Sequence, residues 1–444
     1  MIEARALPDP GRLSALRFYP RRSFATTLSF LEEMARTYGD IAHFKLFFDH
    51  FFMIDDADLL REVLVTRQHD FVKSRGAVVL RRFFGEGLIT SEEPLHRTQR
   101  RLMQPAFNHD RVATYGSVMT RRALQASAGW RPGESRDIAL EMQRLALGIV
   151  GETLFGADLD PEGGEVRDAI EQIKDLVSQA FGPLGRLTDR LPAFFPGRIE
   201  SEKVAKRLDA VIGRMIERRR AGPASGDLLS MLMRAHEAGG ASPMSDRQLR
   251  DEAITLLLAG NDTTALALTW TWYLLAKHPE VEAQLHAELD AVLGERIATP
   301  DDVAQLPYTM KVLTEALRLY PPAWLLGRTA IRRVAIGKYE IASGDTVLFS
   351  PYITHRNPRY YALPHEFRPA RWPVAGLPKF AYLPFGGGAR VCIGEPFAWL
   401  EGALVLATLA RRWRLRADAG SELEIQPYIT LRPSGPLMMH LERR

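Results

Sequence analysis

One ten-residue segment constrains this chain more than any other, because it holds the only cysteine among 444 residues. The segment reads Phe-Gly-Gly-Gly-Ala-Arg-Val-Cys-Ile-Gly over residues 385–394, with the cysteine at Cys392. A lone cysteine cannot form an intramolecular disulfide, so Cys392 is either an inert core residue or a thiolate with a chemical role. The three glycines permit a tight turn and a close approach of the backbone to a flat ligand.

The residues around Cys392 favour the chemical role. Residues 395–407 are apolar with a proline in the first turn, which predicts a helix that begins just after the sulfur. Unpaired backbone N–H groups and the dipole at such a helix start favour the thiolate, the form that binds metal. Arg390 adds a fixed positive charge two residues earlier. We therefore predict that Cys392 is a metal ligand.

This segment resembles the haem-ligand loop of the cytochrome P-450 superfamily, the haem-thiolate monooxygenases. The family pattern is Phe, two residues, Gly, one, Arg, one, Cys, one, Gly, and its fixed places are filled by Phe385, Gly388, Arg390, Cys392 and Gly394. A phosphate-binding interpretation of the glycines fails, because no Gly-Lys-Ser/Thr follows them. The resemblance implies haem b (iron protoporphyrin IX) as cofactor and Cys392 as the axial ligand of its iron.

Two further motifs follow the order of the family. Glu315-Ala-Leu-Arg318 resembles its Glu-x-x-Arg motif, and residues three apart share a helix face, so these charges can meet. Arg371 matches the arginine that joins the pair in the family, although Ala370 stands where the family more often has Glu. Alone, such a pair is more often a solvated ion pair. The resemblance implies a buried structural clamp of Glu315, Arg318 and Arg371 behind the haem.

Residues 259–264, Ala-Gly-Asn-Asp-Thr-Thr, resemble the oxygen-activation segment of the family's long central helix. The flanking residues are apolar on most faces, as in a helix that is buried in a large core. Gly260 removes a side chain where a ligand would press on the backbone, and Thr263 can weaken the local hydrogen-bond ladder. The alternative is an Asn-Asp cap between two shorter helices. The resemblance implies that Asp262 and Thr263, with Thr264 as a further candidate, deliver protons during O–O cleavage.

The resemblance also implies the contacts of cofactor and substrate. Arginine suits a propionate because its planar fork matches a carboxylate. The implied haem contacts are His96, Arg100, Ala259, Gly260, Arg328, Pro384, Phe385, Gly386, Arg390, Cys392, Gly394 and Ala398. The implied substrate pocket comprises Phe83, Phe84, Leu88, Phe181, Ala323, Trp324, Leu325 and Ile429. Apolar residues of this kind also line ordinary cores, so only their match to the family makes them candidates.

The predicted architecture is mainly α with small β-sheets, with the haem between the long central helix and the helix of the cysteine loop, as in the cytochrome P-450 fold. Residues 1–444 are expected to form a single domain, because the motifs lie far apart and must meet at one haem. Apolar spacing predicts a helix over 23–38 and a hairpin over 41–54 with its turn near Asp49-His50. The last segment, 422–442, is predicted to form a closing hairpin.

Composition and charge exclude several classes. The net charge is only +4, which does not indicate nucleic-acid binding. No run reaches the 18 apolar residues of a membrane span, and the first ten residues lack a secretory core, so a soluble, cytoplasmic, bacterial-type protein is expected. Electrons are expected from a separate ferredoxin or flavodoxin-type donor. The basic residues of 411–416 are a candidate docking patch near the haem.

The predicted activity is that of a monooxygenase, which inserts one atom of O2 into an apolar small molecule by hydroxylation or epoxidation. A terpenoid, a steroid and a fatty-acid-like compound all remain open as substrates. One alternative is a peroxide-driven peroxygenase, although members specialised in that way tend to lack the acid–alcohol pair at 262–263. A second alternative is a non-catalytic haem protein that binds gas, which leaves a buried acid and alcohol beside the open iron position unexplained.

Overall fold

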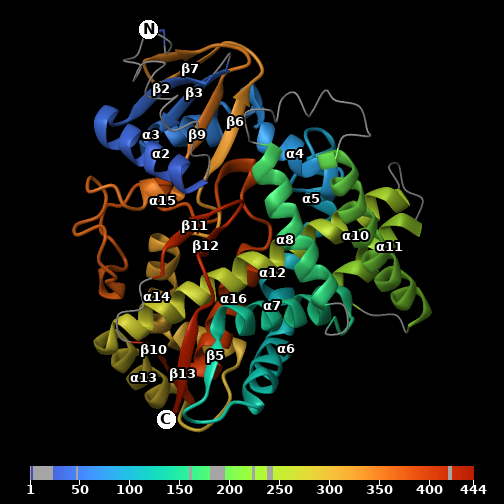
Figure 1. The fold of residues 1–444 in the computed structure, drawn as a ribbon, viewed down its shortest axis with the longest axis vertical. Coiled ribbons are helices and arrows are strands. Elements are labelled where there is room, and N and C mark those ends of the chain that lie inside the picture. The colour runs from blue at the N-terminus through green and yellow to red at the C-terminus, as the bar shows by residue number, and fades with distance from the viewer. Residues whose placement is uncertain are drawn as a thin grey trace.

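Figure 1 shows the computed structural model of the chain. The described residues are 2–3, 24–46, 49–159, 163–180, 196–222, 226–237, 244–418 and 423–444. Phe181, a predicted pocket residue, lies outside them. Helices dominate the described chain and the sheets are small, so the predicted fold class is confirmed.

The largest sheet is built from residues of both halves of the chain. After α2 (Phe24–Tyr38), strands β2 (Ile41–Leu46) and β3 (Asp49–Ile54) pair antiparallel. Asp49 and His50 belong to β3, so the predicted position of the turn is too late along the chain. The full strand order is β2-β3-β9-β6-β4, in which the other members are β4 (Phe71–Lys73), β6 (Leu326–Ala330) and β9 (Thr346–Phe349).

Helices form the larger part of the molecule. The earlier ones are α3 (Ala57–Arg61), α4 (Arg75–Phe84), α5 (Leu95–Met103), α6 (His109–Ala128), α7 (Ile138–Phe155), α8 (Gly163–Ala180), α10 (Pro196–Ala221) and α11 (Leu228–Glu237). The later ones are α12 (Asp246–Lys277), α13 (Pro279–Leu293), α14 (Pro307–Leu319), α15 (Pro351–Thr354) and α16 (Glu395–Ala410). No helix within these described ranges is long and apolar enough to cross a membrane.

The central helix α12 runs through the middle of the molecule (Figure 1). Ser245 starts it with a capping box, in which Ser245 and Gln248 each accept a hydrogen bond from the other's backbone N–H. α7 packs along α12, and α14 and α16 also contact it. The helix is continuous from Asp246 to Lys277, so the alternative of two shorter helices capped at Asn261 and Asp262 is wrong.

The C-terminal strands do not form the single predicted hairpin. β11 (Ile425–Pro427) pairs with β12 (Leu431–Pro433), but β13 (Met438–Arg443) pairs with β10 (Trp413–Ala417) and with β5 (Ser135–Asp137). Gly435 and Pro436 follow β12, and proline has no N–H for a strand ladder, so the chain leaves one sheet there and joins another. The remaining sheet contains β1 (Ile2–Glu3), β7 (Val334–Ile336) and β8 (Tyr339–Ile341).

Candidate active site

Cys392 lies in the loop before α16, and its exposed area opens on a large internal cavity. Protein surrounds the sulfur elsewhere, and this burial raises the pKa of the thiol. Backbone N–H groups of Gly394 and Glu395 at the helix start lower that pKa, but by less than burial raises it. These N–H groups thus favour the thiolate, as expected from the helix start, although burial has the larger effect. A bound metal ion supplies the positive charge that ionises a coordinating thiol.

The three glycines of the cysteine loop serve mainly to pack the loop against protein. A side chain at Gly388 would collide with the backbone carbonyl of Leu64, and one at Gly387 with the ring of Phe380. Gly386 lines the cavity, where an added Cβ would meet nothing closer than Leu326 at 4.0 Å. Close approach of the backbone to a ligand, which we expected of all three, fits Gly386 only.

The middle of α12 forms the opposite wall of the cavity. Thr263 donates a hydrogen bond from Oγ1 to the Ala259 carbonyl at 2.8 Å, as a threonine that loosens the helix ladder does. Gly260 lines the cavity, yet a Cβ there would lie 3.0 Å from Val150 of α7. The absence of a side chain at Gly260 therefore makes room for α7, a helix contact that we had not predicted.

Asp262, the predicted acid, is held by the C-terminal segment of the chain. Thr430 donates to Asp262 Oδ2 at 2.9 Å, and Arg432 forms a close ion pair with Oδ1. Arg432 also lies 3.6 Å from Glu171 of α8. The Asp262 carboxylate is thus an acceptor of two partners beside the cavity that Thr263 and Thr264 also line.

The cavity has a volume of about 1030 Å³, and all twelve predicted haem contacts line it. Six predicted pocket residues line it as well, namely Phe84, Leu88, Ala323, Trp324, Leu325 and Ile429. Phe83 does not, and its ring is 1% exposed within the main core. Successive residues of an α-helix point about 100° apart, so Phe83 turns into the core where Phe84 faces the cavity.

One side of the cavity carries a cationic cluster, which consists of Lys73, His96, Arg328 and Arg390. Lys73 and Arg328 are directly opposite each other on strands β4 and β6. Burial first, and then repulsion from Arg390, lower the pKa of Lys73 to about 7 and that of Arg328 to about 10. Burial also lowers the pKa of His96 to about 4.

Acidic side chains neutralise the cationic cluster only in part. Arg390 bonds to Glu92 at 2.6 Å and His96 to Glu93 at 3.1 Å, but Arg328 pairs with no acidic side chain of the described residues. A buried guanidinium that has only a carbonyl partner calls for an anion. Together with the cavity-facing sulfur of Cys392, the charges of Lys73, Arg328 and Arg390 fit a haem, whose propionates they would hold.

Three features of the site escaped sequence reasoning. Lys73 donates from Nζ to the carbonyls of Leu88 and Ser91 at 2.8 and 2.9 Å, and no local pattern marked it. Arg432, the partner of Asp262, comes from a strand 170 residues further along the chain. The α8 face that lines the cavity could have been found from its helical spacing, since its residues are Ile170, Ile173 and Val177.

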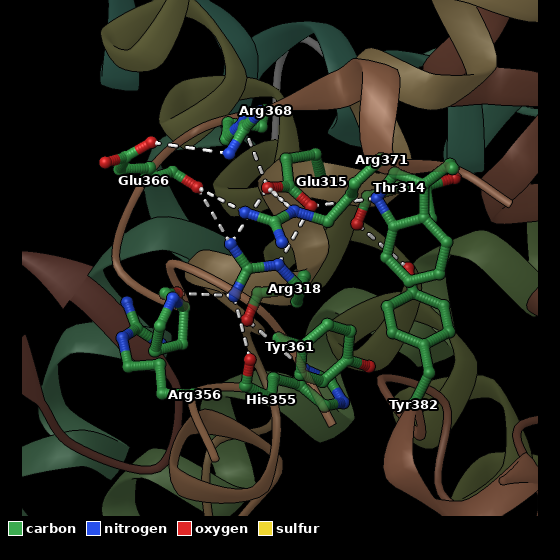
Figure 2. A network of polar contacts seen from close by, with 12 residues as sticks. Thr314, Glu315, Arg318, His355, Arg356, Tyr361, Glu366, Arg368, Arg371 and Tyr382 are labelled. Atoms are coloured by element: carbon green, nitrogen blue, oxygen red, sulfur yellow. Dashed lines mark hydrogen bonds and ion pairs between the residues drawn. The ribbon is translucent and has the colours of Figure 1, made fainter. Parts of the chain in front are cut away.

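The Glu315, Arg318 and Arg371 side chains lie together behind the cavity (Figure 2). Arg318 and Glu315 form two hydrogen bonds of 2.8 Å, and Arg371 donates to Glu315 Oε1 at 2.8 Å. Glu315 and Arg318 are both 0% exposed. His355 joins this network to the cysteine loop, because its Nε2 accepts from Leu383 N at 2.9 Å and its Nδ1 donates to the Arg318 carbonyl at 3.2 Å.

The basic segment 411–416 is not near the cavity. It begins where α16 ends, and a helix of 16 residues separates its two ends by about 24 Å. Arg416 is paired with Glu282 at 2.8 Å and with Glu442 at 3.1 Å. The prediction that this segment forms a docking patch near the haem is therefore wrong.

Comparison with known proteins identifies the class. The family profile described as Cytochrome P450 matches residues 18–440. The chain belongs to this family, whose members bind haem through a thiolate, and it is a P-450 monooxygenase. A solved structure, the cytochrome P450DA heme domain, aligns with a TM-score of 0.85 at 25% identity, covering 98% of this chain and 97% of that one.

Three of the curated relatives come from Streptomyces. Cyclooctatin synthase of Streptomyces melanosporofaciens is 38% identical over 428 residues, covering 94% of this chain and 91% of that protein. Cyclooctat-9-en-7-ol 5-monooxygenase of the same organism is 36% identical over 425 residues, with the same coverage. Pentalenene oxygenase of Streptomyces avermitilis is 33% identical over 408 residues, covering 89% of this chain and 88% of that protein.

Proposed function

We propose that this chain hydroxylates or epoxidises a terpenoid, with O2 and with electrons from a separate protein. The observation that carries the proposal is that the Cys392 sulfur and the Thr263 segment of α12 line one large cavity. The names of the relatives supply the substrate class, since they act on cyclooctatin-type alcohols and on pentalenene. The rigid apolar rings of a terpenoid suit a cavity of this size and lining.

We expect the apolar wall of the cavity to orient such a substrate. Ile170, Ile173 and Val177 of α8 lie along one side, and Leu256 and Ala259 of α12 also contribute. Side chains of this kind bind by shape and exclude water. Asp262 and Arg432 are charged residues at this wall, and they form an ion pair with each other.

The residues near the haem site take distinct parts in the proposal. Cys392 is the ligand of the iron, and the cationic cluster with Arg100 holds the propionates. A thiolate-bound haem supplies the O–O cleavage and the oxidising equivalent. Thr263 and Asp262 are the candidates for proton delivery into the cavity, so Thr263→Ala is expected to divert electrons from product to hydrogen peroxide.

The electron donor is expected to dock at α5, because Arg100 of that helix bonds to the Val391 carbonyl next to Cys392 at 2.6 Å. Arg97 and Arg101 are exposed on the same helix and suit an acidic partner. Arg101→Glu should slow reduction by ferredoxin or flavodoxin, whereas Arg412→Glu at the far end of α16 should not. We further propose one domain over residues 1–444 and, from the bacterial relatives, a cytoplasmic location.

A spectral titration tests the proposed substrate class. Substrate binding next to a haem shifts the iron spin state, so the haem-loaded protein is titrated with pentalenene, a cyclooctatin-type alcohol, a steroid and a fatty acid. We expect a spin shift and an oxygenated product with a terpenoid only. A response to the fatty acid or the steroid alone would contradict it. Cys392→Ala is the control for ligation and should lose the red-shifted Soret band of the carbon monoxide complex.

A further inference from the structure

A second groove lies where α6, α7 and α8 meet, and it has a volume of about 1060 Å³. It shares no lining residue with the haem cavity, and nothing in the proposed mechanism uses it. Charged and amide side chains make up most of its described lining, whereas the haem cavity has an apolar wall. The groove therefore suits a polar ligand and not a second molecule of the substrate.

The arginines of this groove outnumber its acids. Five arginines and three acidic residues of the described chain line it, which gives a formal charge of +2. Glu141 lies 3.9 Å from Arg144 of α7, but it is closer to Arg136, at 3.3 Å. Arg167 of α8 pairs with no acidic side chain of the described residues. Arg144 and Arg167 are thus the cations that remain for an anion.

Asn261 of α12 is the buried polar side chain of the described lining. It is 1% exposed, and its Oδ1 has no hydrogen-bond partner among the described residues. An unpaired buried acceptor costs stability relative to an apolar side chain of similar shape, so packing alone does not explain an asparagine here. The terminal torsion of asparagine is soft, so a rotation of the amide can turn Oδ1 to the groove. A ligand in the groove can then supply the missing donor.

These three side chains call for two different groups on one molecule. The guanidinium forks of Arg144 and Arg167 match the oxygens of a phosphate, whereas Asn261 Oδ1 needs a donor such as a hydroxyl group. The volume of the groove is that of a small-molecule site and exceeds what one inorganic anion fills. A sugar that carries phosphate has both groups and a suitable size.

We propose that this groove binds a phosphorylated sugar, either free or within a nucleotide. Arg144 and Arg167 hold the phosphate, and a sugar hydroxyl donates to Asn261 Oδ1. The ligand would bridge α8 and α12, two helices that also line the haem cavity. The site is separate from that cavity, so the inference does not rest on the proposed terpenoid substrate.

Three variants and one control test the three side chains. Arg144→Gln and Arg167→Gln each remove a cation that is not buried, so both variants should fold. Asn261→Leu keeps the size of the side chain and removes the acceptor; where it loads haem poorly, the two arginine variants decide the outcome. Arg214→Gln is the matched control, because Arg214 of α10 pairs with Glu165 of α8 at 2.9 Å and does not line the groove.

Isothermal titration calorimetry of the haem-loaded protein at physiological salt compares three probes. These are adenosine diphosphate, fructose 1,6-bisphosphate and inorganic pyrophosphate. We expect one saturable site for at least one of the two sugar phosphates, and weaker binding of pyrophosphate, which has no sugar. Binding of adenosine diphosphate alone would identify a nucleotide as the ligand, and binding of fructose 1,6-bisphosphate alone a free sugar phosphate.

Hydrogen bonds to charged groups are the stronger ones, so Arg144→Gln and Arg167→Gln should each weaken binding of the sugar phosphate about tenfold. Asn261→Leu should weaken it severalfold and leave the affinity for pyrophosphate unchanged. Arg214→Gln should change neither affinity by more than about twofold, because salt screens a charge outside the groove.

The proposal would be overturned if neither sugar phosphate binds, or if pyrophosphate binds as tightly as both. An unchanged affinity in Arg167→Gln or an equal loss in Arg214→Gln would also overturn it, since the binding would then depend on net charge or on another surface. These titrations contain no terpenoid and measure no turnover, so failure of the substrate proposal leaves their outcome distinct.

Discussion

Two charged clusters, the Glu315 network and the cationic cluster, differ in whether side chains of the protein satisfy all their charges. Glu315 accepts five hydrogen bonds of 2.8–2.9 Å, from Arg318, Arg371, Trp372 and the backbone of Arg368 (Figure 2). In the cationic cluster, by contrast, Arg328 has only the Gly327 carbonyl at 2.9 Å.

This difference distinguishes a structural ion network from an anion-binding site. A buried ion network whose members are all satisfied fixes the segments that contribute to it, here α14 and the chain on either side of Arg371. A cluster with excess charge destabilises the protein until an anion arrives, and part of the binding free energy of that anion goes into removing the repulsion. The Glu315 network should therefore stabilise the protein with or without haem. The cationic cluster should destabilise the apo-protein and stabilise the haem-loaded protein.

The largest effect is expected from Glu315→Ala. Removal of one partner from a buried network leaves Arg318 and Arg371 uncompensated, which typically costs about 3–5 kcal/mol. We expect little soluble, haem-loaded protein, and a urea midpoint far below that of the parent in whatever folds. The control is Glu366→Ala, because the Glu366 side chain is exposed and pairs with Arg368 only at 3.9 Å. Equal stability of the two variants would show that the network is dispensable.

The same contrast explains what could be predicted from the sequence. The cysteine loop and the Glu315–Arg318 pair are marked by short spacings, which a single sequence displays. Arg371 lies 56 residues after Glu315, and only the family resemblance pointed to it. Lys73 meets Arg328 through the pairing of β4 with β6, and Arg432 meets Asp262 on α12, which lies 170 residues earlier in the chain. Spacing shows neither contact. Phe83 was predicted to line the pocket but is buried in the core. Phe83 and Phe84 are identical in type, and only their different directions from the helix separate them. The predicted C-terminal hairpin is wrong for a related reason, because β13 pairs with β10 on one edge and with the distant strand β5 on the other.

The second prediction concerns Arg328→Met, whose effect should differ between the apo-protein and the haem-loaded protein. Without haem, removal of a buried guanidinium that no acid pairs with should leave the urea midpoint unchanged or raise it. With haem, the variant lacks the proposed hydrogen bond between Arg328 and a propionate, and such bonds contribute about 1.5–3 kcal/mol. The variant should therefore lose haem roughly ten- to hundredfold more readily.

Transfer of haem to apomyoglobin measures the loss of haem. A guanidine or urea titration measures the stability of the apo-protein. Arg328→Lys keeps a positive charge and should retain haem better than Arg328→Met. Arg333→Met is the surface control, since Arg333 is exposed and paired with Glu340 at 2.8 Å. Destabilisation of the apo-protein by Arg328→Met would mean that the cluster is complete without haem.

The smallest expected effect is a pH dependence of the apo-protein that arises from Lys73. Burial lowers the pKa of Lys73 from 10.5 to about 7 in the folded chain, and Arg390 and Arg328 add to this. Between about pH 7 and 10.5 the unfolded chain therefore binds a proton that the folded chain does not, so this group makes stability rise with pH in that window. Below about pH 7 its penalty is complete and constant.

Lys73→Met should remove this contribution, so the difference in urea stability between variant and parent should shrink as pH rises from 7 to 9. The change is at most about 1.4 kcal/mol per pH unit. Glu252, whose pKa burial raises to about 8, titrates in both proteins, so most of its contribution cancels in the difference. In the haem-loaded protein the propionates offset the repulsion from Arg390 and Arg328, so the same difference should vary less with pH. An equal slope with and without haem would show that the anions of the cofactor do not reach Lys73, and the cations that hold them would then be Arg328 and Arg390.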